Sequence, residues 1–286
     1  MIENILNAFT LSMIFIVLGD IIVERSGIVN LSIDGVITLA IAISYVAMLR
    51  FGPLQALILS ISIAITIALA ISLFINILHA SHVLTGLCMN IVLYGASATI
   101  GIALGGGKST RQIALPSIHL VMYTLLAIII VWYMLYRTRI GTAIRACGFN
   151  PRASEVLGVK VWRIRTLALV IGYTLIAIGS YIYISMYRGA WLPYSGMGNG
   201  FLALALAMAS SWHPIIASLI TVLFVYFYTS IYILQLIYGV PAAIINMLPF
   251  IVSIAIVILI QVTPIKKKLS IPRALGEIYF REERAA

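Results

Sequence analysis

Charged side chains are scarce in this chain of 286 residues: Asp, Glu, Lys and Arg make up 9% of it, against 63% hydrophobic residues. No charged residue occurs in the four stretches 51–107, 112–136, 166–187 and 189–265. A soluble domain normally carries about 25% charged residues, so the composition excludes that class. A bilayer crossing takes roughly 20 consecutive apolar residues, and each stretch is therefore long enough for one membrane helix or several.

Cysteine and catalytic motifs are also missing. The two cysteines, Cys88 and Cys147, fall in an apolar span and in a basic loop, where they cannot pair. The sequence lacks a phosphate-binding Walker motif, a nucleophile next to a base, and a pair of catalytic carboxylates. We therefore expect no catalytic residue, no metal site and no cofactor in this chain.

The long apolar stretches predict an all-α polytopic membrane protein with about 8–10 transmembrane helices, in a single transmembrane domain over residues 1–286. Turn and charge signals between the apolar runs place the spans at about 5–23, 31–49, 54–78, 83–104, 117–136, 166–187, 199–212, 214–235 and 242–262. Segments 31–49 and 199–212 are short or flanked by glycine, which leaves the count open. Segment 199–212 could cross the membrane fully, or dip in and return.

The distribution of basic residues predicts the orientation. Of the 18 Lys and Arg residues, seven lie in 137–165 and six between Lys266 and Arg284. Basic loops next to spans stay on the cytoplasmic side, so the loop 137–165 and the tail 264–286 are expected to be cytoplasmic, in a plasma membrane. The net charge of +10 is explained by this contact with the bilayer surface, and we expect no nucleic-acid partner.

A short amphipathic helix is predicted within the basic loop. Asn150 is a good N-cap, Pro151 suits the first helical position, and Gly158 can end the helix in the left-handed conformation. The apolar face consists of Ala153, Val156 and Leu157. The polar, solvent-exposed side consists of Arg152, Glu155 and Lys160. Two turns are too short to be stable alone, so its flanks or a partner must hold this helix. Such a helix can couple a transport pore to a motor.

Two polar, glycine-rich segments precede short apolar stretches. The first, Asn30–Gly35, contains Ser32 and Asp34, and the second is Tyr194–Gly200. Asn30 or Ser32 could simply cap the next helix, with Asp34 near its N-terminal dipole, or all three could lie beside a transport path. Paired glycine-interrupted segments are typical of repeated halves, often inverted, with the solute between them. The halves show little letter-by-letter similarity, so the repeat is a hypothesis.

Other polar residues in the spans complete the candidate solute path, which consists of Asn30, Ser32, Asp34, Asn90 and Asn199. An intramembrane asparagine more often joins two helices than binds a solute. The tyrosines between positions 173 and 238 could line a pore or form belts at the membrane interfaces, and the belts are the favoured interpretation.

Four motifs in this order resemble a known family: ERSGIVNLSIDG at 24–35, GLCMNIV at 86–92, GTAIRACGFNPRASEVLGV at 141–159 and GMGNGFLALALA at 196–207. Together they resemble the bacterial or archaeal ATP-binding cassette importer permeases of the branched-chain amino acid and ribose type, especially the simple-sugar and nucleoside subgroup, which implies the plasma membrane of a bacterium or archaeon. Asp34 departs from the usual Glu but keeps the charge. The resemblance implies that Asn150–Gly158 is the coupling helix, seated in a groove of a cytoplasmic ATPase. It also implies a second permease subunit, identical or related, and an external substrate-binding protein.

The expected function is therefore import of nucleosides or simple sugars, with ATP hydrolysis in a separate subunit. A branched-chain amino acid is the alternative within the family, although the spans offer few charges to meet its ionic groups. An ion-coupled secondary transporter is a second alternative, which would need more ionisable groups in the membrane. A membrane-embedded enzyme using Asp20, Glu24 or the pair His79 and His82 is the third.

Overall fold

The computed structural model describes residues 7–105, 113, 117–238, 251, 255, 258 and 271–279. Every regular element in these ranges is helical, which confirms the all-α prediction. The elements are α2 (Ala8–Arg25), α3 (Ile33–Arg50), α4 (Pro53–Ser72), η1 (Leu73–Ile77), α5 (His82–Gly105), α6 (Ser117–Arg137), α7 (Arg139–Phe149), α8 (Pro151–Val156), α9 (Val161–Ile182), η2 (Tyr183–Arg188), α10 (Asn199–Ala209) and α11 (Pro214–Tyr238).

Helices α2 and α9 form the centre of the bundle, in contact along their length. Glycine makes the approach close: a Cβ atom at Gly19 would collide with the Gly172 carbonyl, and one at Gly179 would lie 2.7 Å from the Ser12 carbonyl. The Ser12 hydroxyl donates to the Gly179 carbonyl at 2.8 Å. In a membrane the hydrophobic effect does not drive helices together, because lipid is as apolar as their side chains. Close packing of small residues and interhelical hydrogen bonds join the helices instead.

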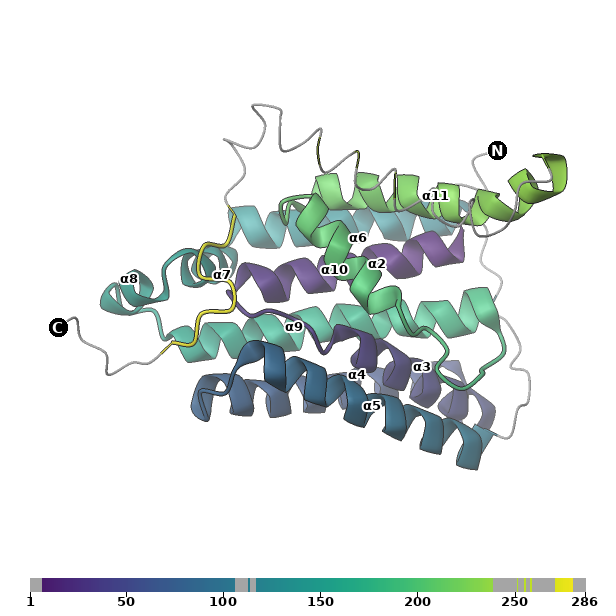
Figure 1. Cartoon of the computed structure of the whole chain (residues 1–286), viewed down its shortest axis with the longest axis horizontal. Helices are drawn as coiled ribbons and strands as arrows, with labels where there is room; N and C mark the ends of the chain where they lie inside the picture. Colours follow the sequence, from purple (N-terminus) through teal and green to yellow (C-terminus); the bar gives the residue numbers. More distant parts are fainter. Residues whose placement is uncertain are drawn as a thin grey trace.

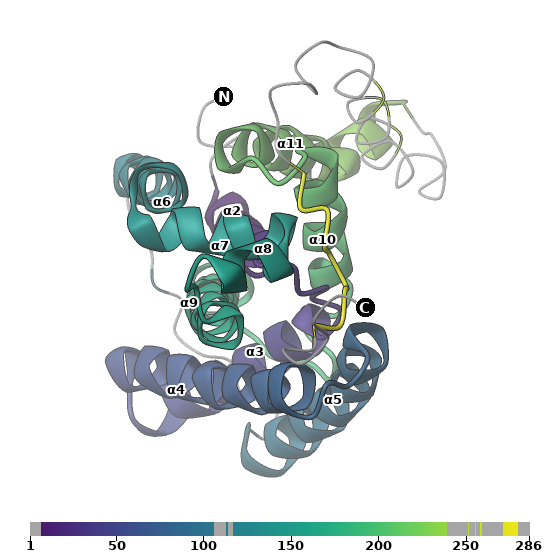
Figure 2. The ribbon, with the colours of Figure 1, turned by 90° about the vertical axis from the view of Figure 1, so that its left-hand side faces the viewer.

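The remaining helices lie on two sides of this centre. Figures 1 and 2 show α4 and α5 on one side, next to α3, and α6 and α11 on the other. The outer helices expose large apolar side chains such as Ile91 on α5 and Ile129 on α6, whereas α2 and α3 are almost entirely buried. An apolar outer surface around a buried centre is what a bilayer requires, because lipid replaces water as the solvent.

Four helices in the described ranges combine the length and low charge of a membrane span: Ile33–Arg50, Pro53–Ile77, His82–Gly105 and Val161–Arg188. The pair Val121–Arg137 and Arg139–Phe149 has this length and low charge only when the two helices are counted together, and they are bent by 71° from each other. Helix α2 has span length but carries Asp20, Glu24 and Arg25, all buried. The predicted span 242–262 lies outside the described residues apart from helical positions 251, 255 and 258, so the total of 8–10 stays a prediction.

Helix α10 is too short to cross a bilayer. Its 11 residues reach about 16 Å at 1.5 Å per residue, roughly half the hydrocarbon thickness. The chain then turns sharply, because Ser211 and Trp212 have φ angles of 51° and 57°, before Pro214 starts α11. Segment 199–212, predicted as a span of uncertain depth, is thus a half-length helix that runs across the bundle.

The two ends of the bundle differ. One end carries α7, α8 and the segment 271–279, and the other carries the start of α2 together with η2 (Figure 1). Helix α7 corrects the prediction that residues 139–149 are part of a loop. Thr138 begins it, with its hydroxyl oxygen accepting from the Gly141 amide at 3.1 Å.

Candidate functional site

Helix α8 has the ends that its sequence predicts. The Asn150 Oδ1 accepts from the Ala153 amide at 3.0 Å, and Pro151 occupies the first turn. Gly158 has a φ of +87°, and around it the Val159 amide donates to the Ser154 carbonyl at 3.0 Å. This pattern of a left-handed glycine and a returning hydrogen bond is a common helix stop. The boundaries of the predicted helix are confirmed to within one or two residues.

The apolar face of α8 points away from the rest of the chain. Val156 is 87% exposed and Leu157 is 83% exposed, the highest values among the large apolar residues that the structure describes. Ala153 is exposed beside them, whereas Pro151 and Ser154 are buried against the bundle. An exposed apolar patch bordered by polar residues is typical of a protein-binding surface.

The support for α8 comes from its neighbours. The Glu155 Oε2 accepts from the Val161 amide at 3.3 Å, which joins α8 to the start of α9. Beneath α8, the Ala274 amide donates to the Gly148 carbonyl at 2.9 Å, and the Gly276 amide donates to the Gly27 carbonyl at 2.9 Å. Segment 271–279 of the predicted tail therefore ties α7 to the loop after α2. Burial in this tied region raises the pKa of the Cys147 thiol to about 11.

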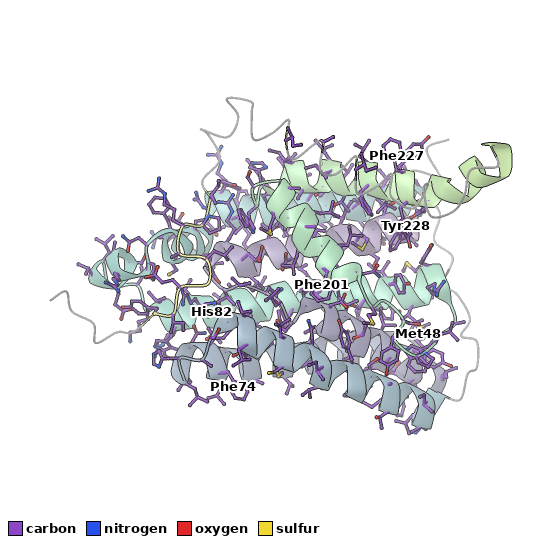
Figure 3. The ribbon with its side chains drawn as sticks, viewed as in Figure 1. Met48, Phe74, His82, Phe201, Phe227 and Tyr228 are labelled. Atoms are coloured by element: carbon purple, nitrogen blue, oxygen red, sulfur yellow. The ribbon has the colours of Figure 1, made fainter. Side chains whose placement is uncertain are left out.

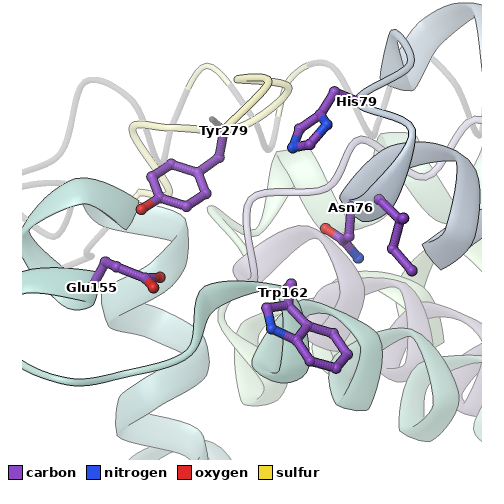
Figure 4. Close-up of a pocket in the computed structure, with 6 residues that line it drawn as sticks. Asn76, His79, Glu155, Trp162 and Tyr279 are labelled. Carbon is purple, nitrogen blue, oxygen red and sulfur yellow. The ribbon is translucent and has the colours of Figure 1, made fainter. Parts of the chain in front are cut away.

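A pocket of about 350 Å³ opens beside α8. Figure 4 shows Glu155 and Tyr279 on one side, Asn76 and His79 on the other, and Trp162 at the base. These residues come from α8, the 271–279 segment, η1 and its connection to α5, and α9. The pocket thus belongs to the same end of the bundle as the exposed face of α8.

Asp34 joins the two polar segments that the sequence analysis singled out. Its Oδ1 accepts from the Gly200 amide at 2.6 Å, and its Oδ2 accepts from the Gly198 amide at 2.9 Å. The Tyr94 hydroxyl of α5 also donates to Oδ2. Asp34 is fully buried, and its carboxylate sits at the N-terminus of α10, where a negative charge is favoured. The starts of α3 and α10 therefore meet at this carboxylate.

Asn90 of α5 caps the start of α3 from outside. Its Oδ1 accepts from the Gly35 amide at 2.6 Å, and its Nδ2 donates to the Leu31 carbonyl. Among the described hydrogen bonds, the side chains of Asn30 and Ser32 cap no α3 amide. The capping interpretation of those two residues is therefore wrong, because a neighbouring helix supplies the cap.

Asn30 and Ser32 instead belong to a buried network with α2 and α9. The Asn30 Nδ2 donates to Asp20 Oδ1 at 2.8 Å, and the Tyr173 hydroxyl donates to Asn30 Oδ1 at 2.7 Å. The Ser32 and Tyr173 hydroxyls lie 2.6 Å apart. Asn30, Ser32, Asp34 and Asn90 are all buried, and each has a partner within the chain. Their contact with a solute stays a prediction.

Glu24, a candidate for an enzyme, and its neighbour Arg25 join the end of α2 to Trp212 in the turn after α10. Glu24 Oε2 accepts from the Trp212 indole nitrogen at 2.6 Å, and the Arg25 Nε donates to the Trp212 carbonyl at 2.9 Å. His82 Nδ1 accepts from the Val29 amide at 3.4 Å, while His79 lines the pocket beside α8. Among the described residues, no group of three or more His, Cys, Asp or Glu side chains could hold a metal ion.

A second pocket, of about 410 Å³, lies at the end opposite α8. Asn199 lines it together with Phe9, Tyr183, Tyr187, Arg188 and Tyr228, and Figure 3 shows Tyr228 on α11 toward that end. Asn199 thus lies between this pocket and the Asp34 junction, because the amides of its neighbours Gly198 and Gly200 bond the Asp34 carboxylate. Tyr173 and Tyr183 are buried inside the bundle, so for these two the interpretation as interfacial belts is wrong.

Comparison with known proteins decides the family. The family model described as the permease component of branched-chain amino acid transport systems matches residues 1–259. The chain belongs to this permease family. The permease is similar to curated relatives over nearly its whole length, although no solved structure matches it.

Three relatives indicate the subgroup. The nucleoside ABC transporter permease protein NupC of Lactococcus lactis is 26% identical, with 96% of this chain and 95% of the relative covered. The guanosine ABC transporter permease protein NupQ of Bacillus subtilis is 26% identical, with 95% and 94% covered. The putative glucose ABC transporter permease protein TsgC13 of Haloferax volcanii is 25% identical, with 69% and 66% covered. The chain is the permease subunit of an ATP-binding cassette transporter, a pore component.

Several important residues of the permease could not be found from the sequence pattern. Tyr94, Gly198 and Gly200 complete the Asp34 junction, and Tyr173 completes the network around Asn30. The available signal was the glycine-rich Tyr194–Gly200 segment itself. Glycine allows the backbone of α10 to approach Asp34, since a Cβ atom at Gly200 would lie 2.5 Å from the Asp34 Cα.

Proposed function

We propose that this permease imports nucleosides, driven by an ATPase subunit that docks on α8. The solute assignment rests on the two relatives named for nucleosides and guanosine, each aligned over at least 94% of both chains. The coupling assignment rests on one observation: α8 is capped at both ends yet presents Val156 and Leu157 to its surroundings. A helix that holds its shape while exposing apolar side chains is built to fit a groove in a partner.

The contacts of α8 provide a route for movement into the bundle. Closure of two ATPase subunits on ATP would press the α8 helices of two permease subunits toward each other. Glu155 would pass that movement to α9 through the Val161 amide, and α9 packs along α2. The coupling segment also includes the residues that shape α8. Asn150 and Pro151 begin the helix, Gly158 ends it, and Arg152 and Ala153 lie on its exposed surface.

The basic loop and tail support a cytoplasmic position for the α8 end. Segment 271–279 lies at the same end as α8 (Figure 1), and both belong to the basic parts of the chain that the positive-inside rule assigns to the cytoplasm. The opposite end would then receive the solute from an external binding protein. We place all of residues 1–286 in one transmembrane permease domain that pairs with a second, identical or related copy.

Co-purification tests the coupling assignment. The permease, expressed with its candidate ATPase subunit and extracted in mild detergent, is expected to retain that subunit. The double variant Val156→Asp and Leu157→Asp should lose it, because two carboxylates would be buried in an apolar groove. The matched control is Leu192→Asp, which is 61% exposed in the η2–α10 connection. Retention of the ATPase by the double variant would contradict the assignment.

Uptake into proteoliposomes tests the solute. With the ATPase and binding protein present, radiolabelled guanosine should accumulate with ATP and should not accumulate under a proton or sodium gradient alone. A simple sugar is the second candidate, because the relative TsgC13 is named as a putative glucose permease. Glucose or ribose uptake without guanosine uptake would favour it, and leucine uptake would favour the amino acid alternative.

A further inference from the structure

The pocket at the end opposite α8 is built by four separate segments of the chain. Phe9 comes from the start of α2, Tyr183 and Tyr187 from η2, Asn199 from the start of α10, and Tyr228 from α11. Its volume of about 410 Å³ falls within the range of roughly 300–1,000 Å³ that small-molecule sites occupy. In the proposed orientation it faces the side from which solute arrives.

The aromatic rings of this pocket form one cluster. Phe9 stacks on Tyr187 with ring centroids 5.0 Å apart and planes 20° apart. Phe9 also lies 6.0 Å from Tyr183 and 5.7 Å from Tyr228, and Tyr183 lies 5.6 Å from Tyr187. Phe9 and Tyr183 are nearly buried, whereas Tyr187 and Tyr228 are 37% and 41% exposed. The buried pair fixes the cluster, and the half-exposed pair can offer ring surface to a ligand.

Polar groups complete the lining. Arg188 and Asn199 both line the pocket, and the Tyr183 side chain forms a hydrogen bond with Asn199. Arg188 is also the single charged residue in the sequence between Thr166 and Ile265. A guanidinium presents a planar fork of donors that suits the acceptor edge of a flat heterocycle, and an amide can both donate and accept.

We propose that this pocket binds the base of an incoming nucleoside, an inference that rests on the proposed function. The base lies against Tyr187 and Tyr228, since every nucleobase has a flat π-face that stacks on aromatic side chains. Arg188 and Asn199 then bond the edge of the base, which fixes its orientation. Free ribose has no such face or heterocyclic edge and binds weakly here.

Equilibrium binding to the permease–ATPase complex in nanodiscs, without binding protein, tests the pocket with radiolabelled guanosine as the probe. Replacing Tyr228 by Ala should weaken guanosine binding about 5- to 100-fold, the effect of losing one stacking ring. Tyr228→Phe, which keeps the ring, should bind like the wild type. The matched control is Tyr226→Ala, two residues away on α11, which is 36% exposed and does not line the pocket.

Each outcome decides between the proposals. Loss with Tyr228→Ala, with binding retained in Tyr228→Phe and Tyr226→Ala and no competition by ribose, supports the pocket. Equal binding by Tyr228→Ala and the wild type overturns it, even if the wild-type transporter imports guanosine, and leaves the nucleoside function standing. Competition by ribose as strong as by guanosine overturns recognition of the base. Absence of guanosine uptake by the complete wild-type transporter overturns the proposed function as well.

Discussion

The Asp34 carboxylate lies 2.6 Å from the Gly200 amide, across 166 positions of sequence. This bond holds the start of α3, in the first half of the chain, against the start of α10, in the second. Both helices begin with a polar, glycine-containing segment, and they meet in the buried interior. Paired interrupted helices that meet near the centre are typical of transporters built from two halves, and in this chain Asp34 is the residue that joins the starts of the two helices.

Loss of the Asp34 charge should loosen this joint. Asp34→Asn replaces one accepting oxygen by a donor, which must then face an amide or the Tyr94 hydroxyl. Hydrogen bonds to a charged group contribute about 1.5–3 kcal/mol each, against about 1 kcal/mol for a neutral pair. We expect Asp34→Asn to lower the apparent melting temperature in detergent clearly, and Tyr94→Phe, which removes one bond, to lower it less. An Asp34→Asn variant as stable as Tyr94→Phe would contradict this role.

Gly200 should tolerate no side chain. A Cβ atom there would lie 2.5 Å from the Asp34 Cα and backbone nitrogen, so Gly200→Ala must push α10 away from α3. Overpacking of this kind typically costs about 1–3 kcal/mol. The control is Gly95→Ala on α5, where a Cβ atom would meet nothing within 4 Å and helix propensity favours alanine. Thermal stability and uptake should fall in the first variant and stay the same in the second.

Local sequence signals were sufficient to predict the helix α8 and both of its ends. The cap Asn150, the proline after it and the stop at Gly158 act within nine residues, and the structure has all three. The apolar runs were equally informative, because low charge over 20 residues decides where a helix can lie in a membrane.

Long-range partners could not be predicted in this way. Asn30 and Ser32 have the composition of helix caps, but Tyr173 binds both, 141 to 143 positions away. Asn90 supplies the cap instead. A side chain that can cap its own helix can equally bond another helix, and only the tertiary packing decides between them. Helix α7 could not be predicted from its local sequence, because the basic residues on both sides of Thr138 are typical of a loop between two spans.

Cys147 should label slowly despite its position in a basic loop. Burial raises the pKa of its thiol to about 11 from 9.0, so near neutral pH the thiolate fraction is about a hundredfold smaller than in an exposed cysteine. In a Cys88→Ser background, we expect slow maleimide labelling at pH 7 and fast labelling after denaturation. Rapid labelling of the native protein at pH 7 would mean that α7 is not packed against the loop after α2.

Gly158 should determine whether α8 keeps the position that coupling needs. Its φ of +87° strains any β-branched side chain, at a cost of about 1–2 kcal/mol, although a Cβ atom there would meet no neighbour within 4 Å. Gly158→Val should therefore leave the protein in the membrane but shift Val156 and Leu157, and ATP hydrolysis should continue with less uptake per ATP. Gly158→Asn is the matched control, because asparagine accepts the left-handed conformation more readily, and it should keep most of the coupling. Equal uptake per ATP in the valine variant and the wild type would show that α8 does not need this stop.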